Sequence, residues 1–375
     1  MKTVVFVFGT RPEAIKMAPV INIFKKDTLN FNTIVVVTGQ HREMLGQALD
    51  VFNIIPDFNL DLMTKGQSLQ SLTNKILKCI SNLFNKIIPD LIFVQGDTTT
   101  TFTVSLAAFY KKIPVAHIEA GLRTNDKFSP FPEEINRKMT TAIATYHFPP
   151  TEQAKENLII EGIRKQYIKV TGNTIIDSLL LISEKIDSEI HYYDRYFTNQ
   201  YGINLNERNT ILVTGHRRES FGQGFENICN AIRKLSKNKD FQIIYPVHLN
   251  PNVQEPVNRI LANLSNVHLI PPQDYKYFVY LMKKSFLILT DSGGVQEEAP
   301  SLNKPVLIMR NNTERPEGIL AGTAFLVGTS SKKIIDLIEK LINDESAYHK
   351  MAMAKNPYGD GDASMKIHKH ISNNI

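Results

Sequence analysis

The sequence has little cysteine, no apolar stretch that approaches the length of a membrane span, and only a small excess of charge. Its two cysteines, Cys79 and Cys229, lie far apart in helix-like patterns without a CxxC motif or neighbouring histidines. This predicts isolated buried thiols and excludes a cysteine metal site or a disulfide. The apolar segment at residues 1–8 runs directly into a glycine turn and is too short for the core of a signal peptide. We therefore expect a cytoplasmic protein with no membrane-spanning segment.

The charge pattern also excludes several classes of partner. The net charge is +6, from 43 basic and 37 acidic residues spread along the chain, with one short basic cluster at residues 366–370. No basic stripe is interleaved with aromatic residues, so we expect no nucleic acid partner, whereas a mild positive excess suits an anionic small molecule. No set of His, Cys or Asp has the spacing of metal ligands, and there is neither a G-x-G-x-x-G turn after the first strand nor a Walker loop. We expect no metal, no cofactor and no ATP chemistry.

Strand and helix patterns alternate along the whole chain, in two series. The expected strands are residues 4–8, 34–38, 91–95, 115–118 and 146–148, followed by 210–213, 242–245, 267–269, 286–289 and 305–308. Such alternation is typical of parallel sheets built from βαβ units, and 375 residues suit two domains. The predicted fold class is α/β, with two doubly wound Rossmann-like domains facing a cleft. Ligands of such sheets bind beyond the carboxyl ends of the strands, which places the expected site in that cleft.

Domain boundaries follow from a break in this rhythm between Thr171 and Arg208, where a glycine turn is followed by a polar, tyrosine-rich stretch at residues 191–201. We place the first domain at residues 1–172 and the second at residues 173–357. The tail at about residues 358–375 begins with a turn-rich segment and ends in a basic helix.

Residues 287–300 are the most informative segment. An apolar strand runs into a turn at Ser292, Gly293 and Gly294, where a helix carrying Glu297 and Glu298 begins. Bare backbone N–H groups at a helix N-terminus favour an anion, and carboxylates in the next turns suit a ribose diol. The segment therefore predicts a site for a nucleotide diphosphate. An ordinary strand-to-helix turn is the alternative for this segment taken alone.

Cations and one carboxylate follow the early strands. Arg11 and Lys16 begin the helix after Gly9 and suit a diphosphate, the alternative being an Arg and a Lys on an ordinary helix surface. Asp97 follows a buried strand and a glycine, and either serves a site or caps the helix beyond it.

Glu119 ends an apolar strand just before a glycine turn. A carboxylate so close to a core strand is costly unless it is paired or used, which favours a functional role. Glu133 lies in the first turn of a helix that opens at Ser129 or Pro130, and the alternative to function is a salt bridge with Arg137.

The second series of strands contributes a histidine and further arginines. His216 follows a strand and Gly215 and is flanked by Arg217 and Arg218, a setting that suits a bound phosphate better than a protein core. Arg315 lies in a loop after the strand at residues 305–308.

Taken together and in order, these motifs closely resemble those of the non-hydrolysing UDP-N-acetylglucosamine 2-epimerases. The matching segments are Gly-Thr-Arg-Pro-Glu at 9–13, Gly-Asp-Thr-Thr-Thr at 96–100, His-Ile-Glu-Ala-Gly-Leu-Arg at 117–123, Pro-Phe-Pro-Glu-Glu-Ile-Asn-Arg at 130–137, Thr-Gly-His-Arg-Arg-Glu at 214–219, Tyr-Pro-Val-His-Leu-Asn-Pro at 245–251 and Asp-Ser-Gly-Gly-Val-Gln-Glu-Glu-Ala-Pro at 291–300. The resemblance runs from residue 3 to about residue 330. It implies the glycosyltransferase-B type of fold, with the C-terminal helix packing back on the first domain.

The resemblance implies interconversion of UDP-GlcNAc and UDP-ManNAc, which supplies precursors of cell-surface polysaccharide. In that family UDP is eliminated to give 2-acetamidoglucal and then added back, which needs acid/base groups on both faces of the sugar and cations for the departing diphosphate. Carried over by position, the catalytic residues are Asp97, Glu119, Glu133 and His216. The substrate-binding residues implied by the same matches are Arg11, Lys16, Gln273, Phe278, Ser292, Gly293, Gly294, Glu298 and Arg315, with Gln273 and Phe278 near the uracil.

Some members of this family bind a second UDP-GlcNAc as an activator and form homodimers. Positions that align with the activator region are Gln40, His41, Glu43, Arg217 and His248, although Glu43 stands where activator-dependent members carry glutamine. Alternatives to the non-hydrolysing epimerase are a hydrolysing relative that releases ManNAc and UDP, a 2-epimerase of another UDP-2-acetamido sugar, a glycosyltransferase of the same fold, and a nucleotide-sugar-binding protein without chemistry.

Overall fold

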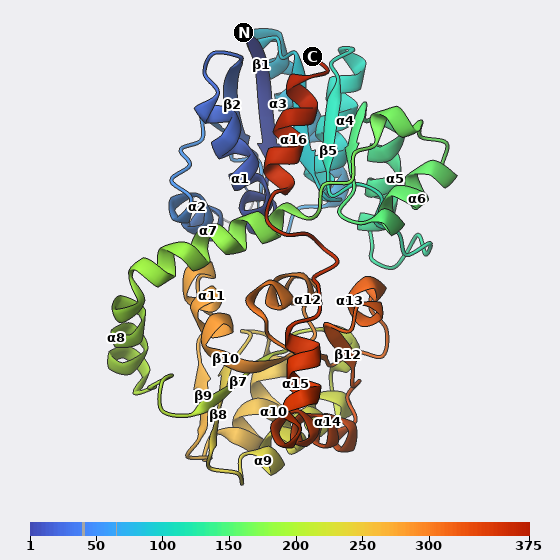
Figure 1. The fold of residues 1–375 in the computed structure, drawn as a ribbon. Coiled ribbons are helices and arrows are strands. Elements are labelled where there is room, and N and C mark those ends of the chain that lie inside the picture. Colours follow the sequence, from blue (N-terminus) through green and yellow to red (C-terminus); the bar gives the residue numbers. More distant parts are fainter. Residues whose placement is uncertain (40–41, 65) are drawn as a thin grey trace. The chain divides into compact units, whose positions relative to one another are not determined.

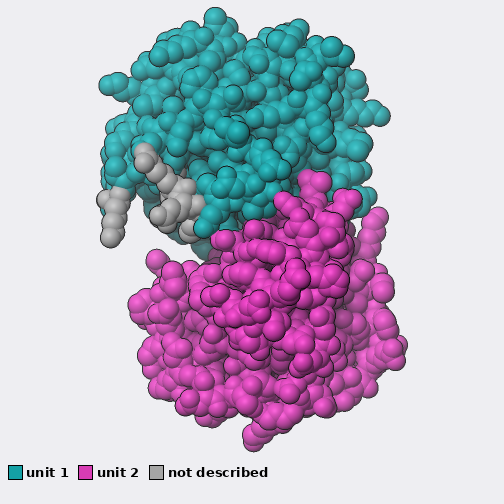
Figure 2. Space-filling view, turned by 90° about the vertical axis from the view of Figure 1, so that its left-hand side faces the viewer, with its two compact units in different colours: residues 1–178, 358–375 teal, residues 179–357 magenta. Residues whose placement is uncertain are grey.

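The computed structural model describes residues 1–39, 42–64 and 66–375, without the side chains of residues 42–44. The chain forms two compact units, coloured separately in Figure 2. The first unit consists of Met1–Ser178 together with Tyr358–Ile375, and the second of Leu179–Pro357. The domain boundary placed at 172/173 from the sequence concerns independent folding and stays a prediction.

The first unit is built on a six-stranded parallel sheet of strand order β3-β2-β1-β4-β5-β6 (Figure 1). The strands are β1 Lys2–Phe8, β2 Phe31–Val37, β3 Phe58–Asn59, β4 Leu91–Gln95, β5 Val115–Ile118 and β6 Tyr146–Phe148. The helices are α1 Arg11–Lys26, α2 Arg42–Val51, α3 Leu69–Ile87, α4 Thr99–Tyr110, α5 Glu133–Ile143, α6 Glu152–Ile160 and α16 Ala363–Ser372, with a 3₁₀ turn at Lys165–Tyr167. Every strand here is followed by a helix, as βαβ winding requires.

Alternation along the central strands directs side chains to opposite faces of this sheet. Val5 and Val7 pack with α3 and α4 in one core cluster, whereas Phe6 stacks on Phe93 at a centroid distance of 4.4 Å on the other face. Phe24 of α1 completes that second face at 5.6 Å from the ring of Phe6. Both faces are therefore buried, which explains why the central strands read as continuous apolar runs.

The C-terminal helix α16 belongs to the first unit, where it packs against α1 (Figure 1). His368 of α16 contacts the ring of Phe24 at 4.8 Å and bonds the carboxylate of Asp27 at 2.9 Å. The backbone N–H and hydroxyl of Ser364 donate to Asp177 Oδ1 at 2.8 and 2.5 Å. These contacts hold the returning chain on the first sheet.

The second unit repeats the architecture with a six-stranded parallel sheet of order β12-β11-β10-β7-β8-β9. The strands are β7 Asn209–Thr214, β8 Phe241–Pro246, β9 Val267–Ile270, β10 Ser285–Thr290, β11 Val306–Ile308 and β12 Ala324–Leu326. The helices are α8 Ile190–Tyr201, α9 Gln223–Leu235, α10 Pro251–Leu261, α11 Tyr275–Lys284, α12 Gly293–Glu298, α13 Pro316–Leu320, α14 Ser331–Asn343 and α15 Glu345–Ala352, with 3₁₀ turns at Arg218–Ser220 and Ala299–Leu302. Helix α7, Thr174–Ser188, begins in the first unit and ends in the second.

The predicted α/β class with two parallel, doubly wound sheets is confirmed, and several local expectations are wrong. The short edge strands β3 and β12 carry too few residues to give a period-2 pattern. The tyrosine-rich stretch at 191–201, for which no element was predicted, is part of helix α8. Helix α5 begins at Glu133, not at Ser129 or Pro130. Cys79 is only partly buried, whereas Cys229 is buried as expected.

Among the described residues, no helix combines the length and apolar character needed to span a bilayer.

Candidate active site

Two loops at the carboxyl edge of the first sheet are tied together by the buried carboxylate of Glu13. It accepts backbone N–H bonds from Gly9 at 3.1 Å and Thr10 at 2.8 Å, in the loop that carries Arg11. Its other oxygen accepts the hydroxyls of Thr98 at 2.8 Å and Thr101 at 3.2 Å. Burial raises the pKa of Glu13, and these hydrogen bonds oppose that rise. Glu13 thus fixes the loop of Arg11 against the loop of Asp97.

Asp97 is held by helix α5. Its Oδ2 accepts a bond from the guanidinium of Arg137 at 2.6 Å, and its backbone carbonyl accepts Nδ2 of Asn136 at 3.0 Å. Arg137 also lies 3.3 Å from the fully buried carboxylate of Glu134. Burial raises the pKa of Asp97, while the charge of Arg137 lowers it and the charge of Glu119 raises it. The side chain of Asp97 keeps 28% of its surface exposed, so a ligand has access to it.

The sequence left a structural alternative to function for Asp97, which was helix capping, and for Glu133, which was a salt bridge with Arg137. Both alternatives are wrong. The N-cap of α4 is Thr98, whose hydroxyl accepts the N–H of Thr101 at 3.1 Å, so Asp97 does not cap that helix. Among the described residues, the ion partners of Arg137 are Asp97 and Glu134, not Glu133. Glu133 is half-buried at the first position of α5.

Glu119 is buried and surrounded by donors. Both of its carboxylate oxygens lie 2.6 Å from Nζ of Lys16, and further bonds come from the side-chain amides of Gln95 and, at 3.1 Å, Asn173. Its backbone is left-handed, with φ of +61°. That conformation costs a non-glycine residue on the order of 1 kcal/mol and recurs at active sites, where surrounding contacts maintain it. Lys16 is thus a partner of Glu119, with only 14% of its side chain exposed, and is not an ordinary surface lysine.

His117 stabilises the turn that precedes Asp97 at this edge of the sheet. Its Nε2 donates to the carbonyl of Gly96 at 2.7 Å, and Gly96 has φ of +69° in the turn that precedes Asp97. Complete burial lowers the pKa of His117 to about 3. The imidazole therefore stays neutral and acts as a fixed hydrogen-bond donor. In the first unit, Lys16, Asp97 and Glu119 come together, and half-buried Arg11 lies on the loop that Glu13 fixes.

In the second unit, His216 is held by Asp291. Nδ1 of His216 lies 3.2 Å from Asp291 Oδ1, and the backbone N–H groups of His216 and Arg217 donate to Oδ2 at 2.7 and 2.8 Å. Burial lowers the pKa of His216, the charge of Asp291 opposes that effect, and Arg217 and His248 add to it. A carboxylate beside Nδ1 favours the protonated imidazole, an arrangement suited to proton transfer. The side chain of His216 is 40% exposed.

The segment after β10 collects most of the predicted nucleotide-binding residues. Nε of Arg315 donates to Glu297 at 2.5 Å, and a Cβ built on Gly293 would lie 2.5 Å from the guanidinium of Arg315. A side chain at position 293 would therefore displace the guanidinium of Arg315 from the start of α12. Glu298, also buried, accepts the hydroxyl of Tyr275 at 2.7 Å. Ser292, Gly293, Gly294, Glu298 and Arg315 thus lie in one place.

Of the two residues expected near the uracil, Gln273 precedes helix α11 and Phe278 lies within it. Nε2 of Gln273 donates to the hydroxyl of Tyr201 at 3.1 Å and to the carbonyl of Pro271 at 2.7 Å. Phe278 is half-buried one turn into α11.

Of the predicted activator-site residues, Gln40, His41 and the side chain of Glu43 lie outside the described residues. His248 is exposed, with its ring centroid 5.6 Å from that of His216, and Arg217 is half-buried beside it. The described residues contain no group of three or more His, Cys, Asp or Glu arranged to hold a metal ion.

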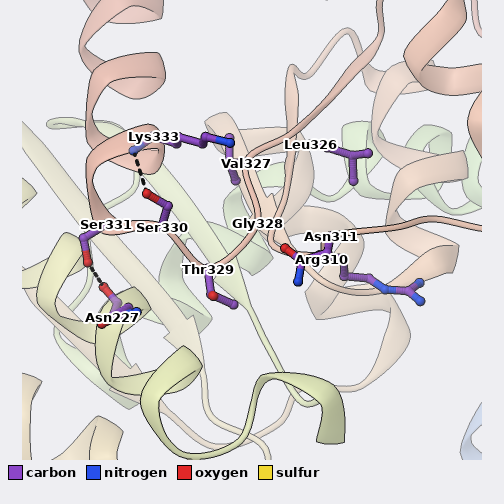
Figure 3. A pocket seen from close by; sticks show the side chains of 10 residues that line it. All are labelled: Asn227, Arg310, Asn311, Leu326, Val327, Gly328, Thr329, Ser330, Ser331 and Lys333. Atoms are coloured by element: carbon purple, nitrogen blue, oxygen red, sulfur yellow. Dashed lines mark hydrogen bonds between the residues drawn. The ribbon is translucent and has the colours of Figure 1, made fainter.

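Two pockets in the described part of the chain lie apart from the predicted catalytic side chains. One, of about 530 Å³, opens in the second unit where β11 and β12 end and α14 begins (Figure 3). Within it the hydroxyl of Ser331 donates to the carbonyl of Asn227, and the N–H of Lys333 donates to the hydroxyl of Ser330. The other, of about 420 Å³, lies between α2 and the end of β2.

Five residues that hold the predicted ones were not among the sequence-based candidates: Glu13, Gln95, Arg137, Asn173 and Asp291. Glu13, Arg137 and Asp291 lie inside the recognised motifs, so the motifs contained that signal. Gln95 is the last residue of β4, where a polar side chain after four apolar ones indicates a site edge. Asn173 gave no signal beyond the preceding glycine, because its partner Glu119 is 54 residues away.

Comparisons with known proteins agree on one family. The family model described as UDP-N-acetylglucosamine 2-epimerase matches residues 24–372. The chain belongs to the UDP-N-acetylglucosamine 2-epimerase family. The family member from Yersinia pestis is 53% identical over 375 residues, covering 99% of this chain and 98% of that protein.

Two solved structures of this family extend the similarity to the fold. The UDP-GlcNAc 2-epimerase of Neisseria meningitidis, bound to UDP-GlcNAc, has a TM-score of 0.91 and 48% identity, covering 99% of this chain and 100% of that one. The UDP-GlcNAc 2-epimerase of Methanocaldococcus jannaschii, in complex with UDP-GlcNAc and UDP, has a TM-score of 0.81 and 35% identity, with complete coverage of both chains at 100%. The likeness spans both units of this family member.

Proposed function

We propose that this chain is a non-hydrolysing UDP-N-acetylglucosamine 2-epimerase that interconverts UDP-GlcNAc and UDP-ManNAc. The proton on C2 of the sugar is not acidic, so its removal must accompany loss of UDP from C1. An enzyme base takes that proton, the C1–O bond breaks with its electron pair going to the β-phosphate oxygen, and a C1=C2 double bond forms. Return of a proton to the opposite face of C2, with UDP adding back to C1, completes the inversion. The reaction needs no external oxidant or reductant.

The observation that carries this proposal is the cluster of Lys16, Asp97 and Glu119 at the carboxyl edge of the first sheet. Two carboxylates placed within electrostatic reach of each other, and each paired with a cation, supply acid/base groups whose protonation states depend on one another. Glu133, the third carboxylate of this unit, is proposed to act with them. Arg11 and Lys16 are proposed to stabilise the negative charge that builds on the departing diphosphate.

The second unit is proposed to contribute His216 and the nucleotide-binding residues. The pairing of His216 with Asp291 supports an acid/base role, because it orients the imidazole and stabilises its protonated form. The gathering of Ser292, Gly293, Glu298 and Arg315 supports binding of UDP, with a cation for phosphate and acceptors for ribose hydroxyls. The Neisseria meningitidis relative was solved with UDP-GlcNAc and the Methanocaldococcus jannaschii relative with UDP-GlcNAc and UDP, which supports the same ligand class here.

Proton NMR of UDP-GlcNAc incubated with the purified protein in D₂O tests the proposal. We expect UDP-ManNAc to appear and both epimers to carry deuterium at C2. Free ManNAc with stoichiometric UDP would contradict the non-hydrolysing route and establish the hydrolysing one. An unchanged spectrum would contradict the proposal and favour another UDP-2-acetamido sugar or a binding protein without chemistry.

Family resemblance further leads us to propose a homodimer and a second UDP-GlcNAc molecule as activator near Arg217 and His248. Sedimentation of the purified protein tests the first point. Hyperbolic kinetics in UDP-GlcNAc, with no lag in the reverse reaction when UDP-GlcNAc is withheld, would contradict the second.

A further inference from the structure

Two chain segments connect the units, and both meet at one point in the first unit. The chain leaves the first unit between Ser178 and Leu179 and returns between Pro357 and Tyr358. Close to these crossings, the backbone N–H of Asn173 donates to the carbonyl of Tyr358 at 2.7 Å. The outgoing and returning segments are therefore bonded to each other directly.

Glycines make this approach possible. A Cβ built on Gly172 would lie 3.1 Å from Cα of Gly359 and 3.2 Å from the carbonyl oxygen of Tyr358. Both glycines also have positive φ, +88° and +127° respectively. A side chain at either position would strain the backbone and push the two segments apart.

Asn173 links this junction to the candidate active site. It is 2% exposed, and its Nδ2 donates to Glu119 Oε1 at 3.1 Å. Its Oδ1 accepts the N–H of Ile175 at 3.1 Å, in the first turn of α7, the helix that contains the first crossing. One residue thus joins three parts of the unit: its backbone bonds the returning segment, and its side chain bonds both the helix that leaves the unit and a carboxylate proposed to move protons.

The bond from Asn173 differs in kind from the other major contact of Glu119. Lys16 lies 2.6 Å from both oxygens and so fixes the charge environment without distinguishing them. The amide of Asn173 contacts Oε1 and that of Gln95 contacts Oε2, so the two amides together fix the rotation of the carboxylate, Asn173 from the side of the junction. Because proton transfer depends on sub-ångström alignment, the direction of that carboxylate matters for the rate.

We propose that Asn173 is a positioning residue that fixes the orientation of the Glu119 carboxylate. It couples that orientation to the contact between residues 172–173 and 358–359, which is the junction of the two chain crossings. The proton-transferring geometry is then complete only when the junction is in the arrangement described above. This inference rests on the proposed epimerase function, in which Glu119 exchanges a proton with substrate.

Two substitutions at Asn173 separate this role from simple capping of α7. Asp and Ser cap helices about as well as Asn. Asn173→Asp, however, would set a second carboxylate against Glu119, and Asn173→Ser would leave Oε1 without the amide. We expect kcat to fall roughly 100-fold in Asn173→Asp and roughly 10-fold in Asn173→Ser. We expect the dissociation constant of UDP, measured by calorimetry, to stay within about threefold of the wild-type value in both.

Asp344→Asn is the matched control, because it exchanges the same two residue types at an exposed N-cap, that of α15, where Asp344 accepts the N–H of Ala347 at 2.9 Å. We expect it to leave kcat unchanged. Wild-type-like kcat in Asn173→Asp, or an equal loss in the Asp and Ser variants, would overturn the inference. A wild-type protein that fails to epimerise UDP-GlcNAc would instead overturn the proposed function itself.

A second test moves the junction and leaves Asn173 in place. In Gly359→Ala the new Cβ would lie 3.2 Å from Cα of Gly172 and 3.5 Å from N of Asn173. Gly162→Ala is its control, since Gly162 also has positive φ, +88°, but its Cβ would meet nothing within 4 Å. We expect kcat to fall at least about tenfold in Gly359→Ala with UDP affinity retained, and to be unchanged in Gly162→Ala. Equal kcat in the two alanine variants would count against the link.

Discussion

At the scale of single residues, Asp97 and Glu119 are held in different ways. Asp97 bonds the guanidinium of Arg137, whereas Glu119 bonds the ammonium of Lys16 and two neutral amides. The guanidinium of an arginine keeps its proton throughout the pH range in which proteins work, whereas the ammonium of a buried lysine can release one. Glu119 is therefore paired with a cation whose chemistry permits proton exchange, whereas Asp97 is paired with one that stays protonated.

Arg137 is expected to set the ionisation of Asp97. In Arg137→Gln the pKa of Asp97 rises further, because the guanidinium charge that opposes the effect of burial is gone. We expect kcat to fall about 100-fold and the acid limb of its pH profile to move upward by about one pH unit or more. Epimerisation rates measured from pH 5 to 9 in both directions check this.

Lys138→Gln is the control for that variant, since Nζ of Lys138 lies 3.7 Å from Glu134 on the half-exposed side of the same helix. Its pH profile should match that of the wild type. An acid limb that stays in place in Arg137→Gln would show that Arg137 does not control Asp97.

Buried histidines are expected to make the first unit sensitive to acid. Burial lowers the pKa of His147 to about 4, from its ordinary value of 6.5. Between these values the unfolded chain binds a proton that the folded chain does not, so the free energy of unfolding decreases as the pH falls from 6.5 to 4. The slope from one such histidine is at most about 1.4 kcal/mol per pH unit.

Urea denaturation of His147→Gln across this window should show a shallower loss of stability with falling pH than the wild type. His191→Gln, at an exposed histidine of α8, should keep the wild-type slope. Parallel curves for wild type and His147→Gln would refute a depressed pKa at this position.

At the scale of elements, the sequence predicted the strands whose residues form clear apolar runs. Strands β4, β5 and β6 have the bounds expected, because apolar runs end at turn signals there. Asp97, Glu119 and His216 could be proposed from the sequence because each follows a strand at the carboxyl edge of its sheet. The pairing of Asn173 with Glu119 could not be predicted, because tertiary packing alone brings these two residues together. Helix α5 was placed too early because two prolines precede it without a side-chain cap.

Glu13 connects the loop of Arg11 to the loop of Asp97. Replacing one of its carboxylate oxygens by an amide NH₂ group should weaken that connection. In Glu13→Gln the NH₂ group would face either the N–H groups of Gly9 and Thr10, which cannot accept, or the hydroxyls of Thr98 and Thr101, which would have to reverse their bonds in order to accept. We expect a loss of about 1–3 kcal/mol in the free energy of unfolding. Glu152→Gln, at a 71% exposed glutamate of α6, should change it by less than about 0.5 kcal/mol. Equal urea midpoints for the two variants would contradict this.

At the scale of the whole molecule, the first unit is discontinuous in sequence and the second is continuous. Residues 358–375 complete a unit that begins at residue 1, whereas residues 179–357 form the other without interruption. The last helix therefore contributes to the stability of the first sheet although it is the most distant from it along the chain.

Substitutions in α16 should consequently affect one unfolding transition and not the other. Ile367 is 0% exposed, so Ile367→Ala should cost about 2–5 kcal/mol in the first unit. Met365, on the same helix, is 64% exposed, and Met365→Ala should be nearly silent. Calorimetry, with UDP added to mark the transition of the second unit, checks the assignment. A shift of the UDP-sensitive transition in Ile367→Ala would contradict it.

The return of the chain to its first sheet also sets an order of events during translation. The second unit has all of its residues once position 357 has been synthesised, and by then the first unit still lacks α16. The ribosome must release residues 358–375 before Ile367 and Ile371 can cover α1 and before Asp177 acquires its hydrogen-bond donors. The earliest residues to emerge are thus among the last to reach their final packing, and a nascent chain in which α16 has not yet emerged would carry a complete second unit beside an incomplete first one.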